Sequence, residues 1–197
     1  MTTHSFDARA SIAIELPDEA ATIALGAALG GAVEDAFESS IPVRQSGFTI
    51  HLCGDLGTGK TTLARALLRR LGVTGHIKSP TYTLVEPYVV NLTKKVESRQ
   101  DLSLYCYHFD FYRFEDPQEW LAAGFRDLFS DAALRLVEWP ENARSESGDP
   151  LPRPDLCITL INNDVGRRAT IEALSAEGRT CLSQIRAPIG GASLRAG

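Results

Sequence analysis

The pattern of apolar and polar positions in the first part of the chain predicts strands and helices joined by a glycine-rich loop. Residues 11–16 alternate weakly, which is typical of a short strand, and residues 20–33 form an Ala-rich helical pattern. Residues 48–53 are apolar and rich in β-forming side chains, so we expect a buried strand there. Glycines punctuate residues 54–59, and residues 60–71 then repeat Leu and Ala on one face of a strong helix. The glycine-rich loop therefore connects a predicted buried strand to a predicted amphipathic helix.

The rest of the chain is predicted to hold two hairpins separated by a helix and a further strand. Residues 81–90 and 104–114 have β-like patterns, and the polar segment 91–103 between them predicts a long solvated hairpin tip. Further elements are predicted in this order: a helix at 117–123, a strand at 133–137, and hairpin strands at 156–161 and 168–173. We expect one domain over residues 1–175, with the 91–103 hairpin as an extension, and a partly disordered tail over residues 176–197.

The charge and the cysteines narrow the classes of function. The chain has 20 Lys and Arg against 25 Asp and Glu, a net charge of −5, whereas a protein that grips nucleic acid alone usually shows a basic field. Any role with nucleic acid is therefore expected to go through a partner. No apolar run approaches the ~20 residues of a membrane span, and residues 1–10 lack the apolar core of a signal peptide. The four cysteines are far apart in sequence, which favours thiols in a reducing compartment. We expect a cytoplasmic protein that contacts no membrane.

The segment from Gly54 to Thr61 fits the phosphate-loop pattern G-x-x-x-x-G-K-[ST]. Glycines let successive backbone N–H groups turn toward one anion, and the following helix adds its positive end. Lys60 is expected to reach the β- and γ-phosphates, and Thr61 to offer its hydroxyl to Mg²⁺. A glycine-rich turn with an incidental lysine is the alternative, but the strand before the loop and the helix after it argue against that interpretation. The predicted nucleotide-binding residues of the loop are Asp55, Leu56, Gly57, Thr58, Gly59, Lys60, Thr61 and Thr62.

Two acidic residues, Asp110 and Glu138, lie at or near the ends of predicted strands. Phosphate-loop chemistry needs carboxylates near Mg²⁺ and the attacking water. Glu138 ends an apolar strand in the Walker B manner, although an acid at a strand end is often only solvated. Asp110 alternates with apolar neighbours and so shares a strand face with His108 and Tyr112, and for His108 we expect a structural hydrogen bond. We predict Glu138 and Asp110 as the catalytic acids and, with Thr61, as metal ligands.

Ser79, Pro80 and Thr81 form a third candidate element. Pro80 stiffens the entry to the segment and Thr81 supplies a hydroxyl. In nucleotide switches a threonine of this kind senses the γ-phosphate through Mg²⁺. The same residues also fit an ordinary turn before a strand, so both interpretations stay open on these residues alone.

Taken together, these residues resemble the TsaE (formerly YjeE) family, the ATPase component of the bacterial machinery that makes threonylcarbamoyladenosine in tRNA. The resemblance covers about residues 16–173 and rests on five blocks in order: 16–19, 54–62, 79–86, 108–113 and 138–141. The third and fourth blocks are the specific ones, because generic phosphate-loop kinases and GTPases lack them.

The resemblance implies a fold and a set of partners. It implies a compact single-domain α/β fold of the P-loop NTPase type, with a largely parallel sheet, antiparallel additions and helices on both faces. It also implies an ATPase that is slow alone, uses ATP and Mg²⁺, and works with the proteins TsaD and TsaB. In that machinery TsaD transfers the threonylcarbamoyl group to the adenosine beside the anticodon. The chain would therefore reach tRNA only indirectly, through the complex.

The resemblance also assigns residues. It implies the roles already predicted for the phosphate loop and the two acids, and it places Thr81 in a switch-like loop and Trp139 beside the site. It puts Glu19 and Arg167 where the two ends of the family's chain approach the nucleotide base and ribose. The long 91–103 segment and the C-terminal tail depart from the family pattern.

Three rival functions share the phosphate loop. A small-molecule kinase usually carries an Arg-bearing lid, but the Arg-rich stretch 65–70 lies on the phosphate-loop helix. A GTPase would need the N-K-x-D guanine motif, and residues 162–164 come closest but lack the lysine, so we expect ATP to be preferred over GTP. A scaffold that binds ATP but barely hydrolyses it has the same motifs and stays open.

Overall fold

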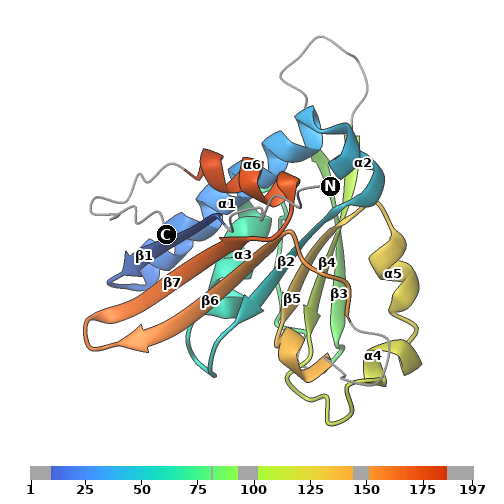
Figure 1. Ribbon diagram of the computed structural model, residues 1–197. Coiled ribbons are helices and arrows are strands. Elements are labelled where there is room, and N and C mark those ends of the chain that lie inside the picture. The colour runs from blue at the N-terminus through green and yellow to red at the C-terminus, as the bar shows by residue number, and fades with distance from the viewer. Residues whose placement is uncertain (1–9, 81, 93–101, 144–150, 186–197) are drawn as a thin grey trace, which may run out of the picture.

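The computed structural model describes residues 10–80, 82–92, 102–143 and 151–185, which form one seven-stranded sheet with helices on both faces (Figure 1). The strands are β1 (Ala10–Leu16), β2 (Phe48–Cys53), β3 (Val85–Leu92), β4 (Leu102–Asp110), β5 (Leu134–Glu138), β6 (Leu156–Asn163) and β7 (Gly166–Ala173). The helices are α1 (Glu19–Ser39), α2 (Ile41–Ser46), α3 (Lys60–Arg70), α4 (Glu119–Ala122), α5 (Arg126–Ser130) and α6 (Ala176–Gln184), with a 3-10 turn η1 (Pro140–Ala143).

The sheet has a parallel centre and antiparallel edges. Its strand order is β1-β7-β6-β2-β5-β4-β3, and the pairs β6–β2, β2–β5 and β5–β4 are parallel. The outer pairs β1–β7, β7–β6 and β4–β3 are antiparallel. The predicted α/β fold with antiparallel additions is confirmed, with parallel pairing confined to the four central strands. Because parallel strands run the same way, the carboxyl ends of β2, β5 and β4 meet at one edge, where open α/β sheets bind ligands.

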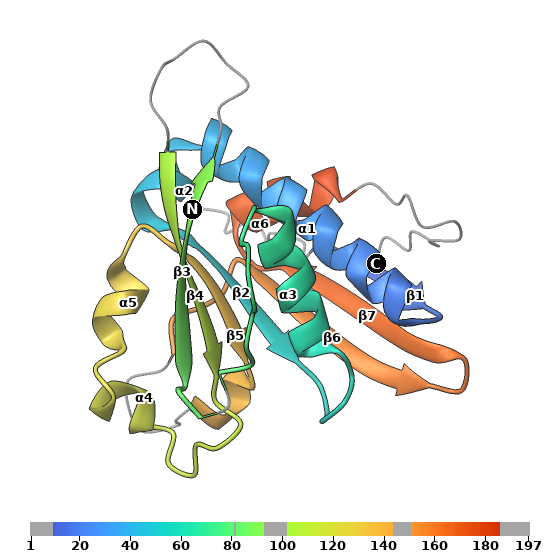
Figure 2. The ribbon, with the colours of Figure 1, turned by 180° about the vertical axis from the view of Figure 1, so that it is seen from behind.

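Helices α1 and α3 pack closely on one face of the sheet (Figure 2). Helix α1 begins as predicted, with the Asp18 carboxylate accepting a hydrogen bond from the Ala21 N–H at 2.8 Å. Two of its glycines make the close approach possible, because a Cβ atom on Gly26 would lie 2.6 Å from the Cβ of Ala66, and one on Gly30 would lie 2.8 Å from the Cβ of Arg70. Contrary to the expectation from the sequence, an 18-residue stretch of helix α1 is long and apolar enough to cross a membrane by length and composition, but half of that stretch is buried in this core. Its apolar composition is explained by that packing.

The opposite face of the sheet, over β4 and β5, carries a separate aromatic core beneath α4 and α5 (Figure 1). Phe109 is fully buried at its centre, with ring centroids 5.4 Å from Phe125 and 5.1 Å from Phe129. Alternation along β4 sends Phe109 to this face and His108 to the face of α3. The two-residue period of the strand therefore separates structural aromatics from polar residues.

Several elements differ from the sequence predictions. Helices α2 and α5 are short and were not predicted, and β3 begins at Val85 instead of residue 81 because Leu84 N–H donates to Pro80 O at 2.7 Å in a turn. Strand β4 ends at Asp110, not residue 114, because the chain turns there and Tyr112 N–H donates to the Asp110 carboxylate. Most of the predicted hairpin tip, residues 93–101, lies outside the described residues.

The first part of the predicted tail is ordered, because residues 176–184 form helix α6 and pack against α1 and β7. Ser175 caps the helix, with its hydroxyl oxygen accepting from Gly178 N–H at 2.8 Å and its hydroxyl donating to Asp155 Oδ1 at 2.6 Å. Cys181 and Leu182 are buried in the main core. Burial raises the pKa of the Cys181 thiol to about 12. The helix was missed because its apolar face is only two turns long; residues 186–197 of the predicted tail lie outside the described residues.

Candidate functional site

The phosphate loop leaves the carboxyl end of β2 and enters α3, as the sequence predicted. Gly54 has φ +126° and Gly59 has φ +98°, conformations that side chains with a Cβ rarely adopt. A Cβ on Gly54 would collide with the carbonyl of Leu160, and one on Gly59 with the guanidinium of Arg167. The loop is thus pressed between neighbouring strands, and only glycine fits at these two turns. Thr58 steadies it by donating its hydroxyl to Asp55 O at 2.9 Å.

Lys60 folds back over the loop. Its ammonium donates to the carbonyls of Gly54 and Asp55 at 2.5 and 2.8 Å and lies 3.8 Å from the centroid of the Trp139 ring. Desolvation by burial lowers the pKa of Lys60, and the nearby carboxylates, with Glu138 the strongest, oppose that shift. Trp139 has φ +56°, a strained conformation for a bulky residue, which is held where the chain turns out of β5.

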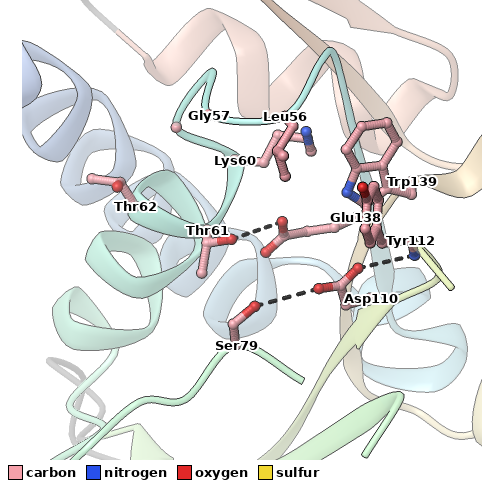
Figure 3. Close-up of a pocket in the computed structure, with 11 residues that line it drawn as sticks. Leu56, Gly57, Lys60, Thr61, Thr62, Ser79, Asp110, Tyr112, Glu138 and Trp139 are labelled. Carbon is pink, nitrogen blue, oxygen red and sulfur yellow. Dashed lines mark hydrogen bonds between the residues drawn. The ribbon is translucent and has the colours of Figure 1, made fainter. Parts of the chain in front are cut away.

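Glu138 connects the end of β5 to the first turn of α3. Its Oε2 accepts the Thr61 hydroxyl at 2.9 Å (Figure 3). Its Oε1 contacts Nε2 of His108 at 2.8 Å. The Glu138 residue is only 2% exposed, so both carboxylate oxygens are satisfied within the protein. Thr61 and Glu138, both predicted as metal ligands, are therefore in direct contact.

Asp110 lies beside Glu138, because the two residues are partners in the parallel register of β4 and β5. Asp110 Oδ1 accepts from Tyr112 N–H at 3.0 Å and Oδ2 accepts from the Ser79 hydroxyl at 3.3 Å (Figure 3). The sequence placed His108, Asp110 and Tyr112 together; in the structure Asp110 and Tyr112 line the pocket described below, and His108 contacts Glu138 from outside it. The sequence missed Ser79 as the partner of Asp110, although Ser79 stands in the same block as Thr81.

These side chains surround a pocket of about 280 Å³. The phosphate loop and α3 line one side of it, and the ends of β4 and β5 line the other. The lining residues are Leu56, Gly57, Gly59, Lys60, Thr61, Thr62, Ser79, Asp110, Tyr112, Glu138 and Trp139. The pocket therefore combines a cationic loop on one wall with two carboxylates on the facing wall.

Some of the other residues predicted to bind the nucleotide do not line this pocket. Asp55 and Thr58 belong to the loop but do not line the pocket, and Glu19 is exposed at the start of α1. Arg167 reaches the loop from β7, where its Nη1 donates to Thr58 O at 3.3 Å, but it also lies outside the pocket lining. Thr81 lies outside the described residues.

The donor set of the pocket fits Mg²⁺. Hydroxyl and carboxylate oxygens of Thr61, Glu138 and Asp110 are hard ligands, and Mg²⁺ is usually held by one or two carboxylates together with substrate phosphates. Within the described ranges, no group of three or more His, Cys, Asp or Glu side chains could hold a metal alone.

In comparisons with known proteins, the family model and the similar sequences carry the same family name, and a solved structure shares the fold. The family model for "Threonylcarbamoyl adenosine biosynthesis protein TsaE" matches residues 16–170. The chain is 38% identical over 134 residues to the "tRNA threonylcarbamoyladenosine biosynthesis protein TsaE" of Haemophilus influenzae, covering 68% of this chain and 75% of that protein. It is 39% identical over 159 residues to the protein of the same name from Nostoc sp., covering 79% and 81%. The crystal structure of Bacillus subtilis YdiB is similar in fold, with a TM-score of 0.57 and 23% identity over 90% of this chain and 93% of that one.

Proposed function

We propose that this chain, which belongs to the TsaE family of threonylcarbamoyladenosine biosynthesis proteins, binds ATP with Mg²⁺ and hydrolyses it in support of tRNA modification. The observation that carries the proposal is the direct hydrogen bond between Thr61 and Glu138. It joins the phosphate loop to the strand-end acid within one pocket. A nucleotide held by the loop would thus have its terminal phosphates beside a carboxylate.

The loop is suited to hold the phosphates. Its glycine turns and the start of α3 present backbone N–H groups, and Lys60 supplies a positive charge at the same place. In the structure that ammonium binds the carbonyls of Gly54 and Asp55. We propose that it exchanges these carbonyls for phosphate oxygens when ATP binds, because an anion is the stronger partner for an ammonium.

Glu138 and Asp110 would have different roles in metal binding and in orienting the attacking water. Thr61, Glu138 and Asp110 would hold Mg²⁺, directly or through water, and the metal would neutralise charge on the phosphates. Glu138 lies nearest the loop and is suited to orient the attacking water. Asp110, held by Ser79 and by the backbone of Tyr112, is suited to hold the metal from the other strand.

The partners we propose are TsaD and TsaB, with tRNA reached through them. The formal charge of −5 gives the chain alone little attraction for a polyanion, which favours recognition of tRNA by the assembled complex. ATP hydrolysis by this chain would then sustain turnover of the complex, and the group transfer itself would occur elsewhere.

A nucleotide titration tests the binding part of this proposal. ATP should bind with Mg²⁺ and be preferred over GTP, and Lys60→Ala should weaken binding while circular dichroism shows an intact fold. Affinity unchanged in a folded Lys60→Ala variant would contradict the assignment of the phosphate loop, and displacement of ATP by an equal concentration of GTP would contradict the choice of base.

A further inference from the structure

We propose that His108 is a positioning residue that fixes the orientation of the Glu138 carboxylate for catalysis. The inference rests on the proposed role of Glu138 in ATP hydrolysis and assigns a function to a residue outside the pocket. His108 is not among the pocket-lining residues, so it acts on the substrate only through Glu138.

The contact is short and completely enclosed. His108 lies on β4, between β3 and β5, with 0% of its surface exposed, and its Nε2 is 2.8 Å from Glu138 Oε1. On the same face of β4 its neighbours Leu104 and Cys106 are buried in the main core. An imidazole in such surroundings carries a desolvation cost that a Leu would avoid, so packing alone does not explain a histidine here.

The hydrogen on the ring can be assigned from the partners. An ionised carboxylate only accepts hydrogen bonds, so Nε2 carries the hydrogen and donates it to Glu138 Oε1. The other ring nitrogen, Nδ1, has no hydrogen-bond partner among the residues that the structure describes. His108 therefore has one polar contact in the described fold, and that contact is with the candidate catalytic acid.

The consequence is that the two oxygens of Glu138 are no longer equivalent. Oε1 contacts His108. Oε2 is left facing Thr61 and the phosphate loop (Figure 3). Without the histidine the carboxylate could rotate about its last side-chain bond and withdraw Oε2 from the loop. Small displacements of a catalytic group cost rate because the reacting atoms must meet in a narrow geometry. Holding the carboxylate is thus the positioning role of a residue that touches no substrate.

Two substitutions of His108 by amide side chains, Gln and Asn, distinguish the positioning role from a purely structural one. In His108→Gln the amide nitrogen is as many bonds from the backbone as Nε2, so it can still donate to Glu138. In His108→Asn the amide nitrogen corresponds to Nδ1 and cannot reach. Both variants place a small polar amide in the same core position, and circular dichroism and thermal unfolding report whether each folds.

We expect His108→Gln to keep the rate of ATP hydrolysis within about threefold, and His108→Asn to lose about 10- to 100-fold, the usual effect of removing an outer partner of a catalytic or metal-binding group. ATP affinity should change less than about threefold in both, because the loop contacts are untouched. Placed in a Glu138→Gln background, His108→Asn should cause no further loss. A folded His108→Gln that loses rate as His108→Asn does, or a folded His108→Asn with the normal rate, would overturn the inference. If His108→Asn fails to fold, His108→Gln alone decides.

Crystal structures of the two variants supply a test that is independent of activity. Glu138 Oε2 should stay within hydrogen-bond distance of Thr61 Oγ1 in His108→Gln and move away in His108→Asn. An unmoved carboxylate in His108→Asn refutes the positioning role. If the unsubstituted protein hydrolyses no ATP, the proposed function fails, and these structures still show whether His108 holds the carboxylate.

Discussion

Replacing Glu138 by Gln should lower ATP hydrolysis far more than ATP affinity. The substitution keeps the shape of the side chain and removes its charge. The amide oxygen can still accept from His108, and the amide nitrogen can donate to the Thr61 hydroxyl, which is able to accept. The fold should therefore survive with a loss of about 1 kcal/mol or less, the size of one altered hydrogen bond.

The rate is affected differently because the charge acts as the transition state forms. Lys60, the loop N–H groups and the metal hold the phosphates in the ground state, whereas a carboxylate that orients water contributes mainly during phosphoryl transfer. A loss of ~10²-fold corresponds to ~2.7 kcal/mol of transition-state stabilisation. The assay is single-turnover hydrolysis with TsaD and TsaB present, beside a titration of ATP affinity.

Asp110→Asn is the matched variant on the neighbouring strand. Its amide can keep the contacts with Tyr112 N–H and the Ser79 hydroxyl, so it too should fold. Hydrolysis should fall in both variants, with at least one of them keeping its ATP affinity. Normal hydrolysis in both would show that these acids are only structural. A loss of binding in proportion to rate in both would show that they hold the ground-state metal, and the division of roles would be wrong.

Three further predictions concern the fold and the partners. Gly26→Ala should destabilise the protein by about 1–3 kcal/mol in denaturant unfolding, because the new Cβ meets Ala66 and the Leu63 carbonyl at 2.6 Å. Gly31→Ala, whose Cβ meets nothing closer than 3.6 Å, should instead be neutral or stabilise by up to about 1 kcal/mol, and equal effects would refute the close packing of α1 on α3. Burial raises the pKa of Asp155, so the contribution of this carboxyl group to stability is present at low pH and lost as pH rises through its pKa in the folded state. The unfolding free energy of Asp155→Asn, relative to that of the wild type, should therefore rise with pH through that range. A difference that does not change with pH would contradict the raised pKa. The isolated chain should bind tRNA weakly in a filter or fluorescence titration, and tight, salt-sensitive binding without TsaD and TsaB would contradict the partner-mediated interpretation.

The sequence was informative where chemistry is local. The strand, glycine loop and helix around Lys60 are specified by neighbouring residues, and Glu138 was identified because it ends an apolar run. The adjacency of Asp110 and Glu138 follows instead from the register of β4 on β5, which depends on the whole sheet. Patterning along one strand predicted the face of Asp110 but could not show which strand would lie beside it.

The position of helix α6 and that of Arg167 also depend on contacts between distant parts of the chain. Helix α6 has too short an apolar face to give a clear period, and it is held by the long-range contact of Ser175 with Asp155. Arg167 was predicted to approach the nucleotide, and the structure shows its guanidinium on the carbonyl of Thr58. Its position depends on the β6–β7 hairpin that carries it past the loop, which the sequence of the turn alone does not specify.

The release of phosphate from ATP by this chain, measured with Mg²⁺ in the presence of TsaD and TsaB, tests the central claim most directly. The wild-type protein should hydrolyse ATP, omission of Mg²⁺ should stop it, and Lys60→Ala should abolish it without loss of fold. Absence of hydrolysis by the wild-type protein in the complete mixture, or equal hydrolysis by Lys60→Ala, would contradict the account.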